Sequence, residues 1–179
     1  LQFMGMRASQ MCTIWKAVFA GQHQRLRCVI APQTGWVDVA SASLDCPKWV
    51  KAGNPPCSQS ADAVAITGYF SGNLQRPENA ETIKGWLAVS KEHALELAFR
   101  QLRDGDVPGL KSGEETVTAR TADSLRNTIE RFKAFRAIAD KRGLGLIAYE
   151  GGTHFDHGDD PVIKSFLIDV GRDARMEGL

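Results

Sequence analysis

Glu150 is the residue whose type and position most directly suggest chemistry. It stands in the stretch LIAYEGGTHF at residues 146–155, after an apolar run and before two glycines. A carboxylate carried to the end of a buried strand can act as a nucleophile or as a base. Glycines at this point would let the backbone turn without hindrance from Cβ atoms. The pattern therefore predicts a glutamate at the mouth of a cleft.

Polar and aromatic residues also follow two earlier apolar runs, CVIA at 28–31 and DAVAITGYF at 62–70. In parallel α/β folds, ligands gather at the carboxyl ends of the strands, so side chains from separate strands would meet there. An indole face can lie against sugar C–H groups, while amides and hydroxyls can bond to sugar hydroxyls. The residues expected to meet such a polyhydroxylated ligand are Gln33, Trp36, Tyr69, Glu150, Thr153 and His154.

The segment HFDHGDD at 154–160 holds imidazole and carboxylate groups in close succession. His154, Asp156 and His157 are candidate metal ligands, but their spacing matches no established motif. Short acidic loops are more often solvated turns, and Asp160 is placed to cap a following helix. No glycine-rich phosphate-binding motif follows any strand either. We therefore predict neither a metal site nor a cofactor.

The composition is typical of one globular α/β domain: the chain has 179 residues, 43% of them hydrophobic and 24% charged. The formal charge is +1, without a basic stripe, which argues against nucleic acid or an anionic membrane as a partner. No apolar run reaches the roughly 20 residues that a membrane span needs. Because the chain starts at Leu1 without a methionine, we expect residues 1–179 to be a single domain that is processed or excised from a longer product.

The four cysteines fall into two pairs of different surroundings. Cys46 and Cys57 bracket a segment rich in proline and glycine, and a loop disulfide or two free thiols are both compatible with it. A disulfide would indicate an oxidising compartment, so that the protein would be secreted or periplasmic. Cys12 and Cys28 lie within apolar patterns and are predicted to be buried small residues.

Helical periodicity appears in several segments. The stripe of Met11, Ile14, Trp15 and Val18 predicts an amphipathic helix over about 7–20, with Trp15 in the core. Trp86 is also predicted to be a core residue on a helical pattern. Further helices are predicted around 91–104, 125–142 and 161–171, with caps or stops at Ser90, Gly105, Gly143 and Asp160. The last of them would face inward through Ile163, Phe166, Leu167 and Val170. The segment at 104–115 is predicted to be an exposed loop.

Three short apolar runs, at 28–31, 62–70 and 144–150, predict strands that are buried on both faces. Their alternation with helices predicts a parallel sheet. Three strands are too few for a closed barrel, which needs about eight strands and roughly 250 residues. The exposed edges of such a small sheet would favour pairing of two copies into a homodimer.

The stretches MCTIWKAVFAGQHQRLRCVIAPQTG, DAVAITGYF and GLIAYEGGTHF together resemble the later half of a (β/α)8-barrel glycoside hydrolase of the retaining clan. More narrowly, they resemble bacterial glycosidase-like and cellulase-like barrel proteins with a Tyr-Glu-Gly-Gly strand end. The resemblance implies a partial TIM-barrel-like parallel sheet, about strands five to seven of eight, with flanking helices. It assigns Glu150 as the catalytic nucleophile and Tyr69 as the tyrosine that supports it.

The activity implied by the resemblance is hydrolysis of β-linked glucan or a related plant polysaccharide. Retaining hydrolysis needs a second carboxyl group about 5–5.5 Å from the nucleophile. The Asn-Glu pair that carries this group in the clan has no counterpart in the sequence. We therefore expect the acid/base group to come from outside this chain. The alternative is a non-catalytic carbohydrate-binding or metal-binding half-barrel module.

Overall fold

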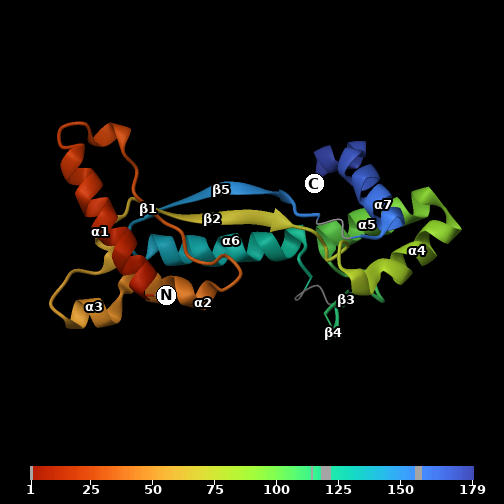
Figure 1. Cartoon of the computed structure of the whole chain (residues 1–179), viewed down its shortest axis with the longest axis horizontal. Helices are drawn as coiled ribbons and strands as arrows, with labels where there is room; N and C mark the ends of the chain where they lie inside the picture. The colour runs from red at the N-terminus through yellow and green to blue at the C-terminus, as the bar shows by residue number, and fades with distance from the viewer. Residues whose placement is uncertain (1, 114, 118–121, 156–158) are drawn as a thin grey trace. The chain divides into compact units, whose positions relative to one another are not determined.

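The computed structural model of the chain describes residues 2–113, 115–117, 122–155 and 159–179 (Figure 1). Apart from one short hairpin, helices and strands follow one another in the predicted order: helix, strand, helices, strand, helices, strand, helix. The described residues form two compact units. Unit 1 comprises those within 1–67 and 131–150, and unit 2 comprises those within 68–130 and 151–179. No helix in the described ranges is long and apolar enough to cross a membrane.

One sheet has the strand order β1-β2-β5. Its strands are β1 (Val29–Ile30), β2 (Ala63–Phe70) and β5 (Gly145–Thr153). β1 pairs with β2 in parallel. β5 runs in the same direction, because the Gly145 amide donates to the Asp62 carbonyl at 3.0 Å and the His154 amide donates to the Phe70 carbonyl at 3.2 Å. The prediction of an α/β fold with a parallel sheet and flanking helices is therefore confirmed.

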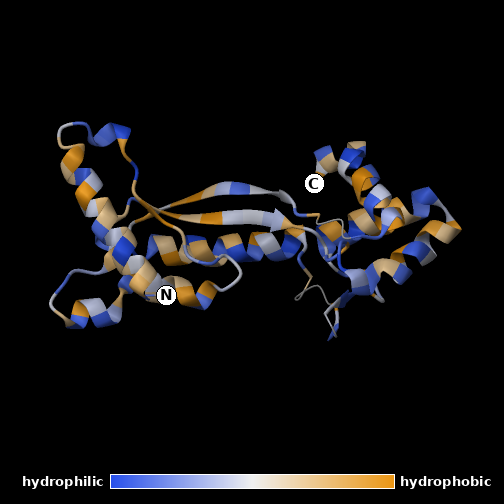
Figure 2. Cartoon of the chain, in the orientation of Figure 1, coloured by the Kyte–Doolittle hydropathy of each residue, from blue (hydrophilic) through white to orange (hydrophobic). Residues whose placement is uncertain are grey.

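The core of unit 1 lies between the sheet and helix α6 (Leu125–Asp140). Phe135 and Ala139 of α6 share one buried cluster with Val64 and Ile66 of β2. The first half of β2 is buried on both faces, and Figure 2 colours this part of the strand as hydrophobic. For this half of β2, the prediction of a doubly buried strand is confirmed.

The other two strands are less buried than the sequence predicts. β1 has only two residues, and Val29 is 37% exposed while Ile30 is buried. Most side chains of β5 are exposed, with Tyr149 exposed to 58%. Among the described strands, β5 lies at the edge of the sheet, with β2 as its one hydrogen-bonded neighbour. The prediction that these two strands are buried on both faces is wrong, because apolar composition does not reveal which strand ends up at an edge.

Helix α1 (Gln2–Val18) packs within unit 1 through small residues. Its buried positions are Gly5, Ser9 and Cys12. A Cβ atom on Gly5 would lie 1.9 Å from the Ser43 carbonyl oxygen of α2 (Val37–Asp45). Only glycine therefore permits the close approach of these two helices.

The apolar stripe predicted for α1 is exposed. The exposed fractions are 58% for Met11, 63% for Ile14, 49% for Trp15 and 67% for Val18. The close packing of the small-residue face turns the larger side chains to the outside of the unit. The prediction that Trp15 is a core residue is therefore wrong.

A disulfide joins Cys46 and Cys57, with a sulfur–sulfur distance of 2.04 Å. It links the residue before α3 (Pro47–Lys51) to the short turn of helix that precedes β2. Of the two interpretations that the sequence leaves open, the structure supports the disulfide. Cys12 and Cys28 are free and buried, as predicted.

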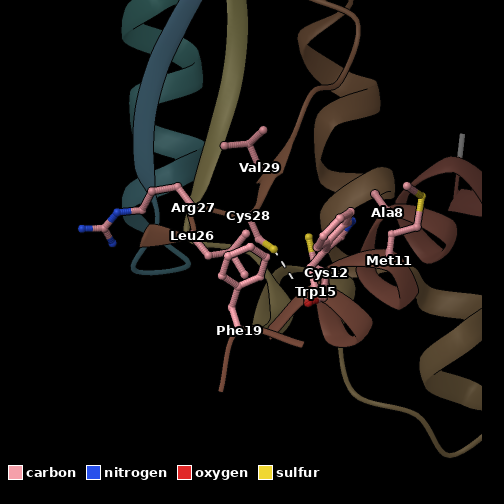
Figure 3. A pocket seen from close by; sticks show the side chains of 9 residues that line it. All are labelled: Ala8, Met11, Cys12, Trp15, Phe19, Leu26, Arg27, Cys28 and Val29. Atoms are coloured by element: carbon pink, nitrogen blue, oxygen red, sulfur yellow. Dashed lines mark hydrogen bonds between the residues drawn. The ribbon is translucent and has the colours of Figure 1, made fainter. Parts of the chain in front are cut away.

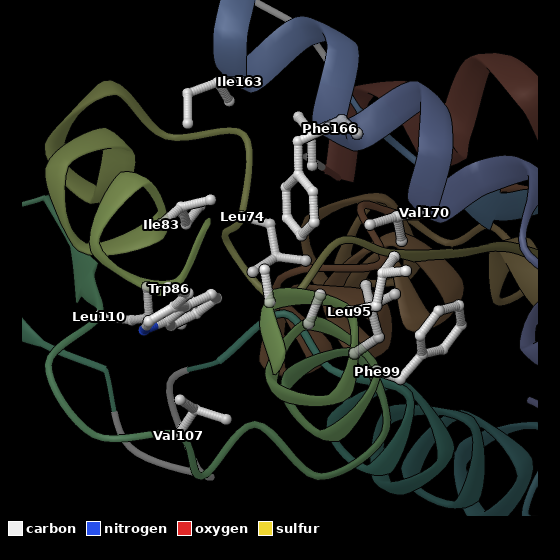
Figure 4. Close-up of a cluster of buried hydrophobic side chains, with 14 of the residues drawn as sticks. Leu74, Ile83, Trp86, Leu95, Phe99, Val107, Leu110, Ile163, Phe166 and Val170 are labelled. Atoms are coloured by element: carbon white, nitrogen blue, oxygen red, sulfur yellow. The ribbon is translucent and has the colours of Figure 1, made fainter. Parts of the chain in front are cut away.

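In unit 2, helices α4 (Ala80–Val89), α5 (Lys91–Asp104) and α7 (Pro161–Arg172) supply much of one apolar core (Figure 4). The predicted inward-facing residues of α7 are all buried, with exposed fractions of 3% or less. Trp86 of α4 is 8% exposed, which confirms its prediction as a core residue. The interior of this unit therefore follows the helical periodicity of the sequence closely.

The predicted caps of these helices are confirmed. Ser90 Oγ accepts a hydrogen bond from the His93 amide at 3.0 Å, and Gly105 ends α5 with φ of 71°. Asp160 Oδ1 accepts hydrogen bonds from the first amides of α7. These bonds satisfy backbone groups that have no partner inside the helix.

The segment at 104–115, predicted to be an exposed loop, is instead partly buried. Val107 and Leu110 belong to the core of unit 2, and β3 (Lys111–Ser112) pairs with β4 (Glu115–Thr116) as a short hairpin. Two buried amides hold this segment. Gln101 Oε1 accepts from the Val107 amide at 2.9 Å, and Asn79 Oδ1 accepts from the Lys111 amide at 2.6 Å. Because most residues of the segment are polar, the sequence did not indicate that Val107 and Leu110 are buried.

Candidate functional site

Glu150 lies near the carboxyl end of β5, and its side chain is exposed. Among the described residues, the Glu150 carboxylate has no hydrogen-bond partner and no ion-pair partner. The carboxylate therefore has no role in holding the described part of unit 1 together. It is open to a ligand from solution.

The sequence predicted that the two glycines after Glu150 turn the chain. This prediction is wrong, because β5 continues through them to Thr153. A Cβ atom on Gly151 would lie 2.9 Å from the Gly68 carbonyl oxygen of β2. Gly152 has φ of 107°, a backbone conformation that side chains disfavour. The first glycine thus permits the close approach of two strands, and the second permits an unusual backbone conformation.

Tyr69 and His154 form a ring pair in unit 2. Their ring centroids are 4.9 Å apart and the ring planes are tilted by 35°. The Thr128 hydroxyl donates to the Tyr69 carbonyl at 3.0 Å, which holds the end of β2 against α6. Tyr69 and Thr153 are half-buried and His154 is exposed. The pair therefore offers an aromatic surface whose backbone is fixed by hydrogen bonds.

Gln33 and Trp36 lie on the segment that follows β1, and Trp36 is 66% exposed. Between them, Thr34 is buried, and its hydroxyl oxygen accepts from the Thr67 amide at 3.0 Å. In the strand order, β2 lies between β1 and β5. No hydrogen bond, ion pair or ring contact within the described ranges joins Gln33 or Trp36 to Glu150. Of the predicted site residues, the structure brings Tyr69 and His154 into contact.

The candidate metal ligands are described only in part. Asp156 and His157 lie outside the described residues, and His154 packs on Tyr69. Within the described ranges, no group of three or more His, Cys, Asp or Glu side chains is placed to hold a metal ion. Asp160 caps α7 and pairs with Lys84 at 2.9 Å. The hydrogen bond from Lys84 holds the pKa of the Asp160 carboxyl below its ordinary value.

Asp62 is a charged residue that the sequence reasoning missed. Its carboxylate accepts from Lys16 Nζ of α1 at 3.0 Å and from the Cys28 amide at 2.7 Å. Burial alone would raise the pKa of Asp62, but these two hydrogen bonds outweigh it and hold the pKa below its ordinary value. Asp62 thus joins α1, the start of β1 and the start of β2. In the sequence, only its position directly before an apolar strand could have indicated this role of Asp62.

No family model, no curated protein and no solved structure matches this chain.

Proposed function

We propose that this chain acts on β-linked glucan or a related plant polysaccharide, with Glu150 as the nucleophile of a retaining glycosidase. The observation that carries the proposal is the exposed carboxylate near the end of a parallel strand, without a partner among the described residues. Parallel α/β barrels place their catalytic groups at these strand ends. The resemblance of the GLIAYEGGTHF stretch to the seventh strand of the retaining clan supports the same assignment.

The strand order supports the barrel part of this proposal. Successive strands of a (β/α)8 barrel are neighbours and parallel, which is also true of β1, β2 and β5. We assign them to about strands five to seven of such a barrel. The exposed side chains of β5 then fit a strand that gains a further neighbour when the barrel closes.

The chemistry needs a second group. In a retaining glycosidase, the nucleophile attacks the anomeric carbon and forms a glycosyl ester while another carboxyl group protonates the departing oxygen. We assign no residue of this chain to that second role. The isolated chain should therefore hydrolyse natural glucan poorly, because a sugar leaving group needs that proton.

A second candidate function is carbohydrate binding without hydrolysis. The Tyr69–His154 ring pair in unit 2 and the exposed indole of Trp36 in unit 1 favour it. Aromatic faces bind the C–H surfaces of sugars, and this interaction requires no carboxylate. Each of the two surfaces would act by itself in this function.

Covalent labelling separates the two functions. A dinitrophenyl β-glucoside with fluorine in place of the hydroxyl beside the anomeric carbon has a leaving group that departs without protonation. A nucleophilic Glu150 should take up one fluoroglucosyl group even without the acid, and intact-mass and peptide mass spectrometry would locate it. Glu150→Gln should remain unlabelled, while Glu96→Gln, at another exposed glutamate, should label like the parent protein.

Binding to soluble β-glucan, measured by affinity electrophoresis, provides the other half of the test. Retarded migration without labelling would contradict the nucleophile and favour the binding module, which Trp36→Ala or His154→Ala should then weaken. Equal labelling of the parent chain and of Glu150→Gln would remove Glu150 from the reaction. Absence of both labelling and retardation would contradict both functions.

A further inference from the structure

An apolar cavity of about 440 Å³ lies in unit 1, between α1 and the segment that leads into β1 (Figure 3). Most of its lining is aromatic or aliphatic and includes Trp15, Phe19 and Val29. Both free cysteines of the chain, Cys12 and Cys28, also line it. Cavities of this size and composition admit small uncharged molecules. The two thiols are therefore within reach of such molecules although their residues are only 6% and 5% exposed.

The two cysteines are neighbours across the contact of α1 with β1. Cys28 Sγ lies 3.8 Å from the Cys12 carbonyl oxygen, and Figure 3 shows the two sulfur atoms side by side. The backbone around Cys28 is held in place, because its amide donates to Asp62 and its carbonyl oxygen accepts from the Asp62 amide at 2.7 Å. Asp62 in turn pairs with Lys16 on α1. The bonds among Lys16, Cys28 and Asp62 thus fix both the strand and the helix that carry the thiols.

Unit 1 already contains one disulfide, Cys46–Cys57, so its fold accommodates oxidised cysteines. All four cysteines of the chain belong to unit 1. Cys46–Cys57 joins α3 to the turn before β2, and it places no covalent link between α1 and the sheet. A bond between the other two cysteines would supply that link.

We propose that Cys12 and Cys28 form a second disulfide, by exchange with a small uncharged disulfide that enters the cavity, and that this bond ties α1 to β1. In the first step the Cys12 thiolate attacks the small disulfide, whose sulfur–sulfur bond breaks and releases one thiol. The other cysteine then loses its proton and attacks the mixed disulfide, which releases the second thiol. In total the protein loses two protons and two electrons, and the small disulfide takes them up and is reduced to two thiols.

The rate of this exchange depends on pH. Burial, and after it the contact with the Cys28 thiol, raises the pKa of Cys12 to about 12. Only a small fraction of Cys12 is therefore present as thiolate at neutral pH, so formation of the Cys12–Cys28 disulfide should be slow there. The rate should rise about tenfold for each pH unit between roughly 7 and 9, because the thiolate fraction does so.

The experiment uses the full chain with Cys46–Cys57 intact and hydroxyethyl disulfide as the probe. After incubation at alkaline pH, the sample is quenched with acid, unfolded with an alkylating reagent and mapped by mass spectrometry. The expected product carries a Cys12–Cys28 peptide and no alkylation on either cysteine. It should also unfold at a higher urea concentration than the untreated chain, because the bond restricts the unfolded state.

Two controls make the outcome decisive. Cys28→Ser should stop at a stable hydroxyethanethiol adduct on Cys12, since no second thiol can displace it. The same treatment of the parent chain in urea gives the time in which accessible thiols are oxidised. Alkylation of both cysteines in the folded parent chain after that time, or a persistent adduct on one of them, would overturn the proposal.

Discussion

Helices α1 of unit 1 and α7 of unit 2 carry apolar stripes of the same spacing, but the stripe of α7 is buried and the stripe of α1 is exposed. Ile163, Phe166, Leu167 and Val170 of α7 are exposed to 3% or less. Met11, Ile14, Trp15 and Val18 of α1 are exposed to between 49% and 67%. A stripe at helical spacing therefore predicts a helix and its apolar side, but it does not show that this side is buried within the chain.

The neighbours of each helix explain the difference. α7 lies against α4 and α5, whose own apolar side chains complete the core of unit 2. α1 meets α2 through Gly5, where a side chain would overlap the Ser43 carbonyl. On the same buried side of α1, the Ser9 hydroxyl oxygen accepts a hydrogen bond from Ser60 Oγ at 2.9 Å. Close backbone approach buries the small-residue side of α1. The larger side chains are left on the outside, where Met11 and Trp15 border the cavity beside the cysteine pair.

The largest expected effect comes from truncating the two stripes at equivalent positions. Phe166→Ala should lower the free energy of unfolding by about 3–5 kcal/mol, because it empties space in a closed core. Ile14→Ala should change it by less than about 0.5 kcal/mol, because the side chain is already exposed. Urea unfolding followed by circular dichroism measures both. A loss for Ile14→Ala as large as that for Phe166→Ala would show that the α1 stripe is buried in solution, for example in a homodimer.

The anchor of α1 in unit 1 is the next test. Asp62→Ala removes the acceptor of the Cys28 amide and the partner of Lys16. We expect a loss of about 1.5–3 kcal/mol, since hydrogen bonds to a charged group are lost and a backbone donor is left unsatisfied. The folded-state pKa of Asp62 is depressed, so its contribution is present above the unfolded value of about 3.8 and is lost as pH falls through the folded value. Unfolding curves between roughly pH 6 and pH 3 should therefore converge for the parent chain and Asp62→Ala, whereas a constant difference would contradict the role of its charge.

Replacing two glycines of unit 2 by alanine should change the free energy of unfolding in opposite directions. Gly151→Ala should destabilise by about 1–3 kcal/mol, because its Cβ would press on the Gly68 carbonyl at 2.9 Å and separate β2 from β5. Gly171→Ala, in an exposed and uncrowded position of α7, should stabilise by about 0.5–1 kcal/mol. Thermal unfolding measures both shifts. Equal tolerance of the two alanines would mean that the strands do not approach closely at Gly151.

A further effect is expected at alkaline pH and should be confined to unit 1, because unit 2 contains no cysteine. The pKa of Cys12 is raised from 9.0 to about 12 in the folded chain with free thiols. Its contribution to stability is therefore complete below about pH 9 and is lost as pH rises through about 12. Measured in urea, the difference between the parent chain and Cys12→Ala should shrink above pH 9. A difference that stays constant to the highest accessible pH would contradict the raised pKa.

The sequence predicted those features that depend on interactions between residues close together in the chain. Ser90, Gly105 and Asp160 act as caps or stops as expected, because capping involves atoms only a few residues apart. The doubly buried half of β2 was also readable from its continuous apolar run. For the candidate site, the position of Glu150 near a strand end was predictable from the same kind of pattern.

Other features depended on neighbours that are distant in sequence. LGLIAYE is as apolar as the buried part of β2, yet β5 is an edge strand and most of its side chains are exposed. Gln33 and Trp36 follow β1, which β2 separates from β5, so a shared position after a strand did not imply contact with Glu150. The order of strands in a sheet is set by long-range packing, and a local pattern carries no information on it.

By itself, the sequence determined where α5 and α7 are capped, that three strands run parallel, and that a carboxylate, a tyrosine and a histidine stand near strand ends. It did not determine the start of α1, which begins at Gln2 and not near residue 7. Tertiary structure alone decided which side of α1 is buried, that Tyr69 meets His154, and that Cys12 and Cys28 share one cavity. The physical reason is the range of the interactions. Capping hydrogen bonds and helical periodicity act within a few residues, whereas close packing at glycines and strand order act between segments that the sequence keeps apart.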